Sequence, residues 1–217
     1  MTTSIMSPDA EPSPLRISLA ARLVPALSYM VAPLGAALSA FMLTGLMRAM
    51  RLSGSAGLGA VTGGLGESTV PVLIALFLAI VGGVAGMVLA IMRLNVQTKT
   101  SSPPVWFFIA SGVLALVPVA LFWQAESVLI DALSPGSGGI VRVASTIEWL
   151  VTLTMIAAPI VILLLLAGSV LPISSRSKPK FSPLVMLIAI ELVLIATAVA
   201  FLMRISWLRD VTLTGRL

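Results

Sequence analysis

Five apolar stretches of membrane-spanning length dominate the chain and restrict what it can fold into. They are Val24–Met47, Thr69–Met92, Val105–Trp123, Ile147–Leu171 and Leu184–Met203. A bilayer core of about 30 Å is crossed by roughly 20 mostly apolar residues in an α-helix. Each stretch is apolar on every side, whereas the strands of an outer-membrane barrel alternate apolar and polar residues. The sequence therefore predicts an all-α integral membrane protein with about five transmembrane helices.

The composition agrees with this fold class and excludes several kinds of function. Hydrophobic residues make up 59% of the chain and charged residues only 10%. The chain has no cysteine and no histidine, so it lacks thiolate nucleophiles and the commonest zinc and haem ligand. No nucleophile–base pair or metal-ligand cluster can be assembled. We therefore expect no metal or other cofactor, no enzymatic activity and no nucleic-acid binding.

The distribution of Lys and Arg between alternate loops gives a weak indication of orientation. Seven basic residues fall on the side of the N-terminus: Arg16, Arg22, Arg93, Lys99, Arg176, Lys178 and Lys180. Six fall on the other side: Arg48, Arg51, Arg142, Arg204, Arg209 and Arg216. The "SSRSKPKFSP" loop (174–183) has three positive charges and no acid, which favours the cytoplasm for that side. The 123–139 segment, with two acids and no base, suits the outer side and could contain a short interfacial helix.

Small residues recur at four-residue spacing in the first two apolar stretches. In lipid, small residues let helix backbones approach closely, and close packing is a main source of helix association. The rows predict either contacts between subunits, which would give a ring-like oligomer, or packing within one subunit. The helix-packing candidates are Ala32, Ala36 and Ala40 in the first stretch, and Ala75, Ala79, Gly82, Gly83 and Gly86 in the second.

The same two stretches resemble a known family. "APLGAALSAFMLTGLMRAM" (32–50) and "GGLGESTVPVLIALFLAIVGG" (63–83) are similar to the paired pore helices of the MotA/TolQ/ExbB proton-channel proteins. Ala32 and Pro33 match the first element, and Gly64, Leu65 and Glu67 match the Gly-Ile-x-Glu element. The family's pore threonine on the second helix falls on Val72, and the part of the first helix that carries the resemblance (32–50) keeps only Ser39 and Thr44 as hydroxyls.

The resemblance implies a domain organisation and a set of partners. The chain divides into a polar N-terminal segment (1–22), a MotA/TolQ/ExbB-like helix pair (23–93), and three further transmembrane helices with a short tail (94–217). In the family, several copies, five by analogy, surround the single transmembrane helix of a partner resembling MotB/TolR/ExbD in the bacterial inner membrane. Proton flow then drives movement of that partner. The alternative is a non-conducting structural subunit of a larger membrane complex, which the lost threonine favours.

Three acids lie in or beside the apolar stretches. Glu67, where a glycine-rich link meets the second stretch, either faces a central cavity or is a helix N-terminal acid that the helix dipole stabilises. Glu191, nine residues into the fifth helix and near mid-membrane, belongs either to a proton path or to a hydrogen bond with a serine or threonine on a neighbouring helix. Glu148 is expected in solvent at the membrane interface. The pore or proton-path candidates are Glu67, Glu191, Ser39 and Thr44.

Overall fold

The chain forms five long helices in a computed structural model that describes residues 14–53, 58–95, 105–133, 140–170 and 183–214. The helices are α1 (Pro14–Ser53), α2 (Leu58–Asn95), α3 (Val105–Leu133), α4 (Ile140–Val170) and α5 (Pro183–Thr214). The described residues contain no strand. Each helix contains a segment long and apolar enough to cross a membrane: Leu27–Arg51, Gly59–Val88, Ala110–Leu133, Val143–Ala167 and Ile188–Thr214. The prediction of an all-helical chain with five such helices is confirmed.

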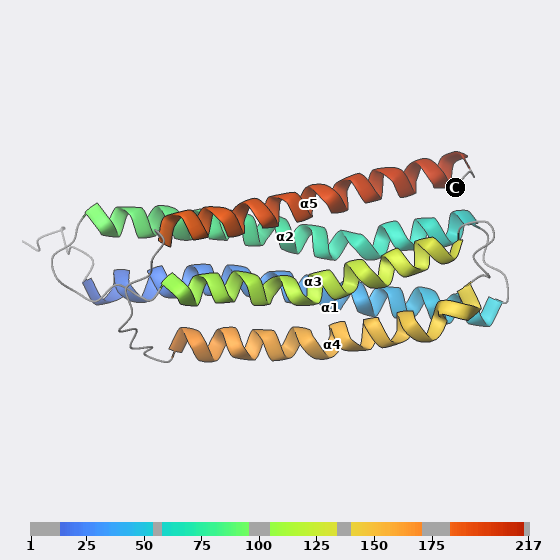
Figure 1. Cartoon of the computed structure of the whole chain (residues 1–217), viewed down its shortest axis with the longest axis horizontal. Helices are drawn as coiled ribbons and strands as arrows, with labels where there is room; N and C mark the ends of the chain where they lie inside the picture. Colours follow the sequence, from blue (N-terminus) through green and yellow to red (C-terminus); the bar gives the residue numbers. More distant parts are fainter. Residues whose placement is uncertain (1–13, 54–57, 96–104, 134–139, 171–182, 215–217) are drawn as a thin grey trace, which may run out of the picture.

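Successive helices run in opposite directions along one bundle (Figure 1). Helices α1, α2 and α3 contact one another, α4 packs against α1 and α3, and α5 packs against α2 and α3. Helices α4 and α5 therefore lie on opposite sides of the other three (Figure 1). We call the end at which α1, α3 and α5 begin the odd end, and the end at which α2 and α4 begin the even end. Because α4 and α5 are peripheral, they bury the smallest shares of their apolar segments, 28% and 22%.

Small residues bring α1 and α2 into close contact. Ala32, Ala36 and Ala40 are fully buried in the chain. A Cβ atom added to Gly35 would lie 2.2 Å from the Cβ of Ala75 on α2, a separation that no packed pair of carbon atoms adopts. The α1 row therefore packs within the chain, as in the second of the two readings above.

The small residues of α2 face two different helices. Ala79 is fully buried. A Cβ on Gly82 would meet the Oγ of Ser28 on α1, and one on Gly83 would meet the carboxylate of Glu191 on α5. Gly86 is also buried. Residues of the same chain pack against Gly82 and Gly83, so these positions are not free to contact another subunit. The ring-like oligomer remains a prediction, and its subunits would have to contact one another through other surfaces.

Helices extend beyond the predicted stretches at several ends. Helix α2 begins at Leu58, so the glycine-rich link is helical from that residue onward, and Gly64 packs against Leu46 of α1. Helix α3 continues to Leu133 and α5 to Thr214, where a loop and a tail were expected. Helices α1 and α4 begin earlier than predicted, at Pro14 and Ile140. Most of the predicted 174–183 loop lies outside the described residues.

The extension of α3 follows from its apolar spacing. Beyond Trp123 the helix still buries Ala125, Leu129 and Ala132, which are spaced three or four residues apart. This is the spacing of a single helix face. The polar residues between them do not interrupt the helix, because the buried face continues. One of these polar residues, Glu126, contacts polar side chains of other helices inside the bundle.

Candidate functional site

A buried polar cluster joins α2, α3 and α5. Glu126 of α3 is fully buried, and the hydroxyl of Thr69 on α2 donates to its Oε1 at 2.5 Å. Arg204 of α5 places Nη1 3.8 Å from Oε2 of Glu126, and Oε2 has no hydrogen-bond partner among the described residues. We call Thr69, Trp123, Glu126, Ser127 and Arg204 the Glu126 site.

The guanidinium of Arg204 is held mainly by α3. Nη2 donates to the Oγ of Ser127 at 2.9 Å, and Nη1 lies 3.4 Å from the carbonyl oxygen of Trp123. The guanidinium carbon also lies 4.0 Å from the centre of the Trp123 ring, a cation–π arrangement. Only 10% of the Arg204 side chain is exposed. Two opposite charges and a hydroxyl therefore share a nearly dry site.

Glu126 can form a hydrogen bond with Thr69 in either protonation state. The Thr69 hydroxyl lies within hydrogen-bond distance of both Glu126 Oε1 and the carbonyl oxygen of Leu65, at 2.8 Å. Its single hydrogen can go to an ionised Glu126, which Arg204 then balances. If Glu126 is neutral, its own O–H can donate to Thr69 while Thr69 donates to the Leu65 carbonyl. The arrangement can therefore hold or release a proton without losing this contact.

The depth of the Glu126 site also sets it apart. Thr69, Glu126 and Arg204 lie well inside the apolar segments Gly59–Val88, Ala110–Leu133 and Ile188–Thr214. Ionisable residues at such depth are costly in lipid, face the bundle interior and pair with one another. Glu126 and Arg204 follow this pattern, since they pair with each other inside the bundle.

A second buried polar pair lies towards the odd end. The hydroxyl of Tyr29 on α1 donates to Oε1 of Glu191 on α5 at 2.8 Å. Glu191 is 4% exposed, and its Oε2 has no hydrogen-bond partner in the described part of the chain. Gly83 of α2 makes room for the carboxylate. Glu191 is hydrogen-bonded to a neighbouring helix, as one of the two interpretations expected, but the partner is a tyrosine and not a serine or threonine. Helix α5 begins at Pro183, so Glu191 is its ninth residue, as the sequence predicted.

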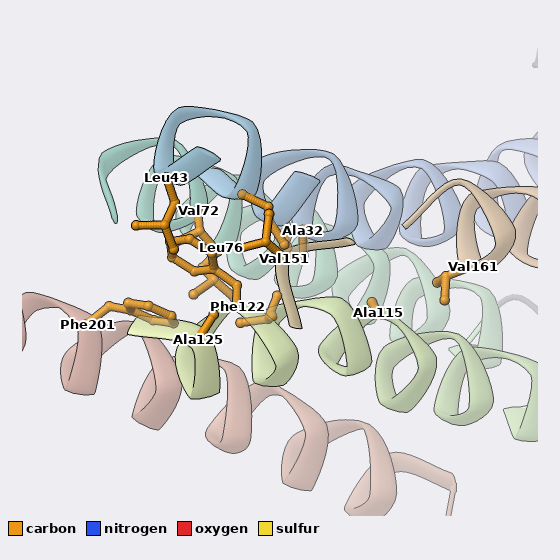
Figure 2. Close-up of a cluster of buried hydrophobic side chains, with 14 of the residues drawn as sticks. Ala32, Leu43, Val72, Leu76, Ala115, Phe122, Ala125, Val151, Val161 and Phe201 are labelled. Atoms are coloured by element: carbon orange, nitrogen blue, oxygen red, sulfur yellow. The ribbon is translucent and has the colours of Figure 1, made fainter. Parts of the chain in front are cut away.

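An apolar layer separates the two buried acids. On α2, α3 and α5, all the side chains that the structure buries between the two sites are apolar. They include Val72, Leu76, Ala115, Phe122 and Phe201, which fill the space between the helices in Figure 2. Thirteen residues separate Glu191 from Arg204 on α5, which is about 20 Å along a helix. No continuous chain of polar side chains joins the two sites within the described residues.

Ser39 and Thr44, the first-helix candidates, have different environments. Ser39 is buried, and its Oγ accepts a hydrogen bond from the backbone N–H of Val72 at 3.0 Å. Val72 follows Pro71, which lies inside α2 and interrupts its regular hydrogen bonding. Thr44 is exposed and donates to the carbonyl of Ala40 at 2.9 Å. Ser39 thus stabilises the α1–α2 contact, and Thr44 is satisfied by its own helix.

Glu67 and Glu148 both lie on the outside of the bundle. Glu67 is exposed and lies nine residues after Leu58, where α2 begins. It is therefore too far along the helix to be an N-terminal acid, and that reading is wrong. Glu148 pairs with Arg51 of α1, and both side chains are about half exposed. The solvated reading of Glu148 agrees with this position, although α4 begins earlier than predicted.

Sequence reasoning missed Glu126 and Arg204 as site residues. Both were assigned to segments outside the helices because charges lower the apolar average near the end of each stretch. The available signal was the helical spacing of apolar residues on both sides of Glu126, which places the acid on a continuing helix. The partners Thr69 and Arg204 could not be identified, because they come from helices far away in the sequence.

Comparison with known proteins gives no relative from which to transfer a function. No protein-family model, curated protein or solved structure matches this chain.

Proposed function

We propose that the chain is a multi-pass membrane subunit with a structural role in a larger membrane complex, and that its own helix bundle does not conduct protons. Five helices of sufficient length and apolarity support the membrane setting. Large apolar side chains cover the outside of the bundle; for example, Phe77, Leu163 and Met203 are each at least 64% exposed. Such a surface is stable in lipid and would aggregate in water.

The apolar layer supports the absence of conduction through one chain. A proton path needs titratable groups or water at intervals that allow transfer, and on α2, α3 and α5 all the described side chains that are buried between Glu191 and Glu126 are apolar. The two polar sites instead join helices. The Glu126 site links α2, α3 and α5, and the Tyr29–Glu191 pair links α1 to α5.

The position of Glu67 is the observation that most supports membership of a complex. This exposed acid shares one face of α2 with a stripe of exposed apolar residues at helical spacing. The stripe consists of Val70, Ile74, Phe77, Leu78, Val81, Val84 and Val88. The hydrocarbon of a bilayer offers no hydrogen-bond donor to a carboxylate inside a span. A donor from another protein chain would remove that cost, so this face is suited to a partner helix.

Orientation is consistent with the cytoplasm at the odd end. Arg204 is buried in the Glu126 site and no longer counts as a loop charge. Five basic residues then remain on the even side, against seven on the odd side. The side richer in Lys and Arg faces the cytoplasm.

Site-specific photo-cross-linking in membranes tests the partner face. A photoreactive residue at Ile74 on α2 is expected to form a protein–protein adduct, and Glu67→Leu is expected to reduce that adduct severalfold. The matched control is Leu192 on α5, which has similar exposure, 60% against 55%, and is expected to give lipid adducts. Lipid adducts alone at both positions would contradict a partner on this face.

A proton-channel subunit resembling MotA/TolQ/ExbB is the second candidate. It is favoured by the capacity of Glu126 to keep its contact with Thr69 in both protonation states. A path in that case would run between copies, five by analogy, around one helix of a partner resembling MotB/TolR/ExbD. The mass of the Ile74 adduct distinguishes the candidates, since a ring requires adducts between copies of this chain.

A further inference from the structure

A groove between α1 and α4 opens towards the even end. It has a volume of about 580 Å³. Its polar part carries Arg48 and Arg51 of α1 and Glu148 of α4. Met47, Val151 and Met155 line it further towards the middle of the bundle. The groove therefore has a charged outer end and an apolar inner end.

The charged end carries an excess of positive charge. Arg51 pairs with Glu148, whereas the side chain of Arg48 is exposed and makes no hydrogen bond or ion pair with the rest of the described chain. Two guanidinium groups against one carboxylate leave one net positive charge. Arg51 also lies in the last turn of α1, where the headgroups of a bilayer around the bundle would lie. Guanidinium groups bind phosphate oxygens in a bidentate manner.

The inner part of the groove offers no free polar group to a ligand. The two threonines that line it donate to carbonyls of their own helices, Thr44 to Ala40 at 2.9 Å and Thr152 to Glu148 at 2.7 Å. Their methyl groups, together with Met155 and Val151, leave an apolar wall. An apolar chain fits such a wall, and a polar peptide would lose hydrogen bonds there.

We propose that this groove binds one anionic phospholipid of the surrounding bilayer, with the phosphate at Arg48 and Arg51 and an acyl chain along Val151 and Met155. The proposal rests on the membrane setting proposed above, and does not depend on the partner face of α2. Glu148 competes with the phosphate for Arg51. It therefore limits the affinity of the groove for anionic headgroups.

Native mass spectrometry of the full chain with mixed micelles of phosphatidylglycerol and phosphatidylcholine tests this site. The wild-type protein is expected to retain one phosphatidylglycerol in preference to phosphatidylcholine. The double variant Arg48→Gln/Arg51→Gln should lose about tenfold of that preference, which corresponds to about 1.4 kcal/mol. Glu148→Gln should strengthen it, a gain that a merely structural acid would not give. Arg209→Gln, an exposed arginine on α5 outside the groove, is the control and should behave as wild type.

Filling the apolar part of the groove provides a second, independent variant. Met155→Trp leaves every charge in place and should reduce retention of phosphatidylglycerol. Equal retention of both lipids by the wild type would overturn the proposal. An equal loss in Arg209→Gln would also overturn it, as would a second copy of the chain in place of the lipid. Cross-linking at Ile74 tests the partner face of α2 and does not depend on the groove, so failure of the partner proposal can be distinguished from failure of the phospholipid proposal.

Discussion

Glu126→Leu is expected to destabilise the bundle by about 3–5 kcal/mol, the cost of leaving one buried charge without its partner. The Arg204 guanidinium cannot lose its charge in a protein, and its side chain is only 10% exposed. Arg204→Leu should cost less, because a lone Glu126 can take up a proton and still bond to Thr69. The double variant should recover most of the loss, since two apolar residues then fill the site. Reversible unfolding in mixed micelles measures all three.

The exposed ion pair on the other side of the bundle is the control for this experiment. Glu148→Leu removes an acid paired with Arg51, and both side chains are about half exposed. Exposed pairs contribute about 0–1 kcal/mol, so this variant should unfold close to the wild type. A loss in Glu126→Leu no greater than that in Glu148→Leu would show that the Glu126–Arg204 contact is not formed as described.

Gly35→Ala is expected to destabilise the protein by roughly 1–3 kcal/mol through overpacking of the α1–α2 contact. The new methyl group would lie 2.2 Å from the Cβ of Ala75 and 2.8 Å from the carbonyl oxygen of Pro71. The second contact is with backbone, so only separation of the two helices relieves it. Gly45→Ala in the same helix is the matched control. A Cβ there meets nothing within 4 Å, and a helical glycine replaced by alanine gains up to about 1 kcal/mol.

The two glycine variants should therefore change stability in opposite directions. Urea or SDS titration of both proteins in the same micelles measures the difference. If Gly35→Ala is as stable as the wild type, α1 and α2 do not approach as closely as their buried alanines indicate.

Much of the fold could be predicted because apolar run length dictates membrane-length helices directly. The five predicted stretches each lie within or largely within one observed helix, and the alanine row of the first stretch is buried. The ends could not be predicted in the same way. The glycine-rich segment before Glu67 has poor helix propensity, yet packing of Gly64 against Leu46 continues the helix, since tertiary contacts outweigh propensity.

The candidate sites were predicted less completely, for a physical reason. Glu191 stood out because an acid inside an apolar stretch is visible in the sequence alone. Its partner Tyr29 lies 162 positions away, and no local pattern identifies such a pair. Glu126 resembled a loop acid in the sequence, and its partners Thr69 and Arg204 come from two other helices, α2 and α5. A polar group can be buried only where such distant partners surround it, so its burial cannot be predicted from the neighbouring residues in the sequence.

Proton flux into proteoliposomes shows whether the helix bundle conducts protons. The wild-type protein, Glu126→Gln and Glu191→Gln are reconstituted singly into vesicles with an internal pH-sensitive dye, and a potassium diffusion potential drives proton entry. A protonophore added at the end checks that each preparation is sealed. Because the layer around Leu76 and Phe122 separates the two buried acids, all three preparations are expected to show the flux of protein-free vesicles. If the wild type shows proton flux and either variant loses it, the bundle conducts protons through that acid, which would contradict a non-conducting structural subunit.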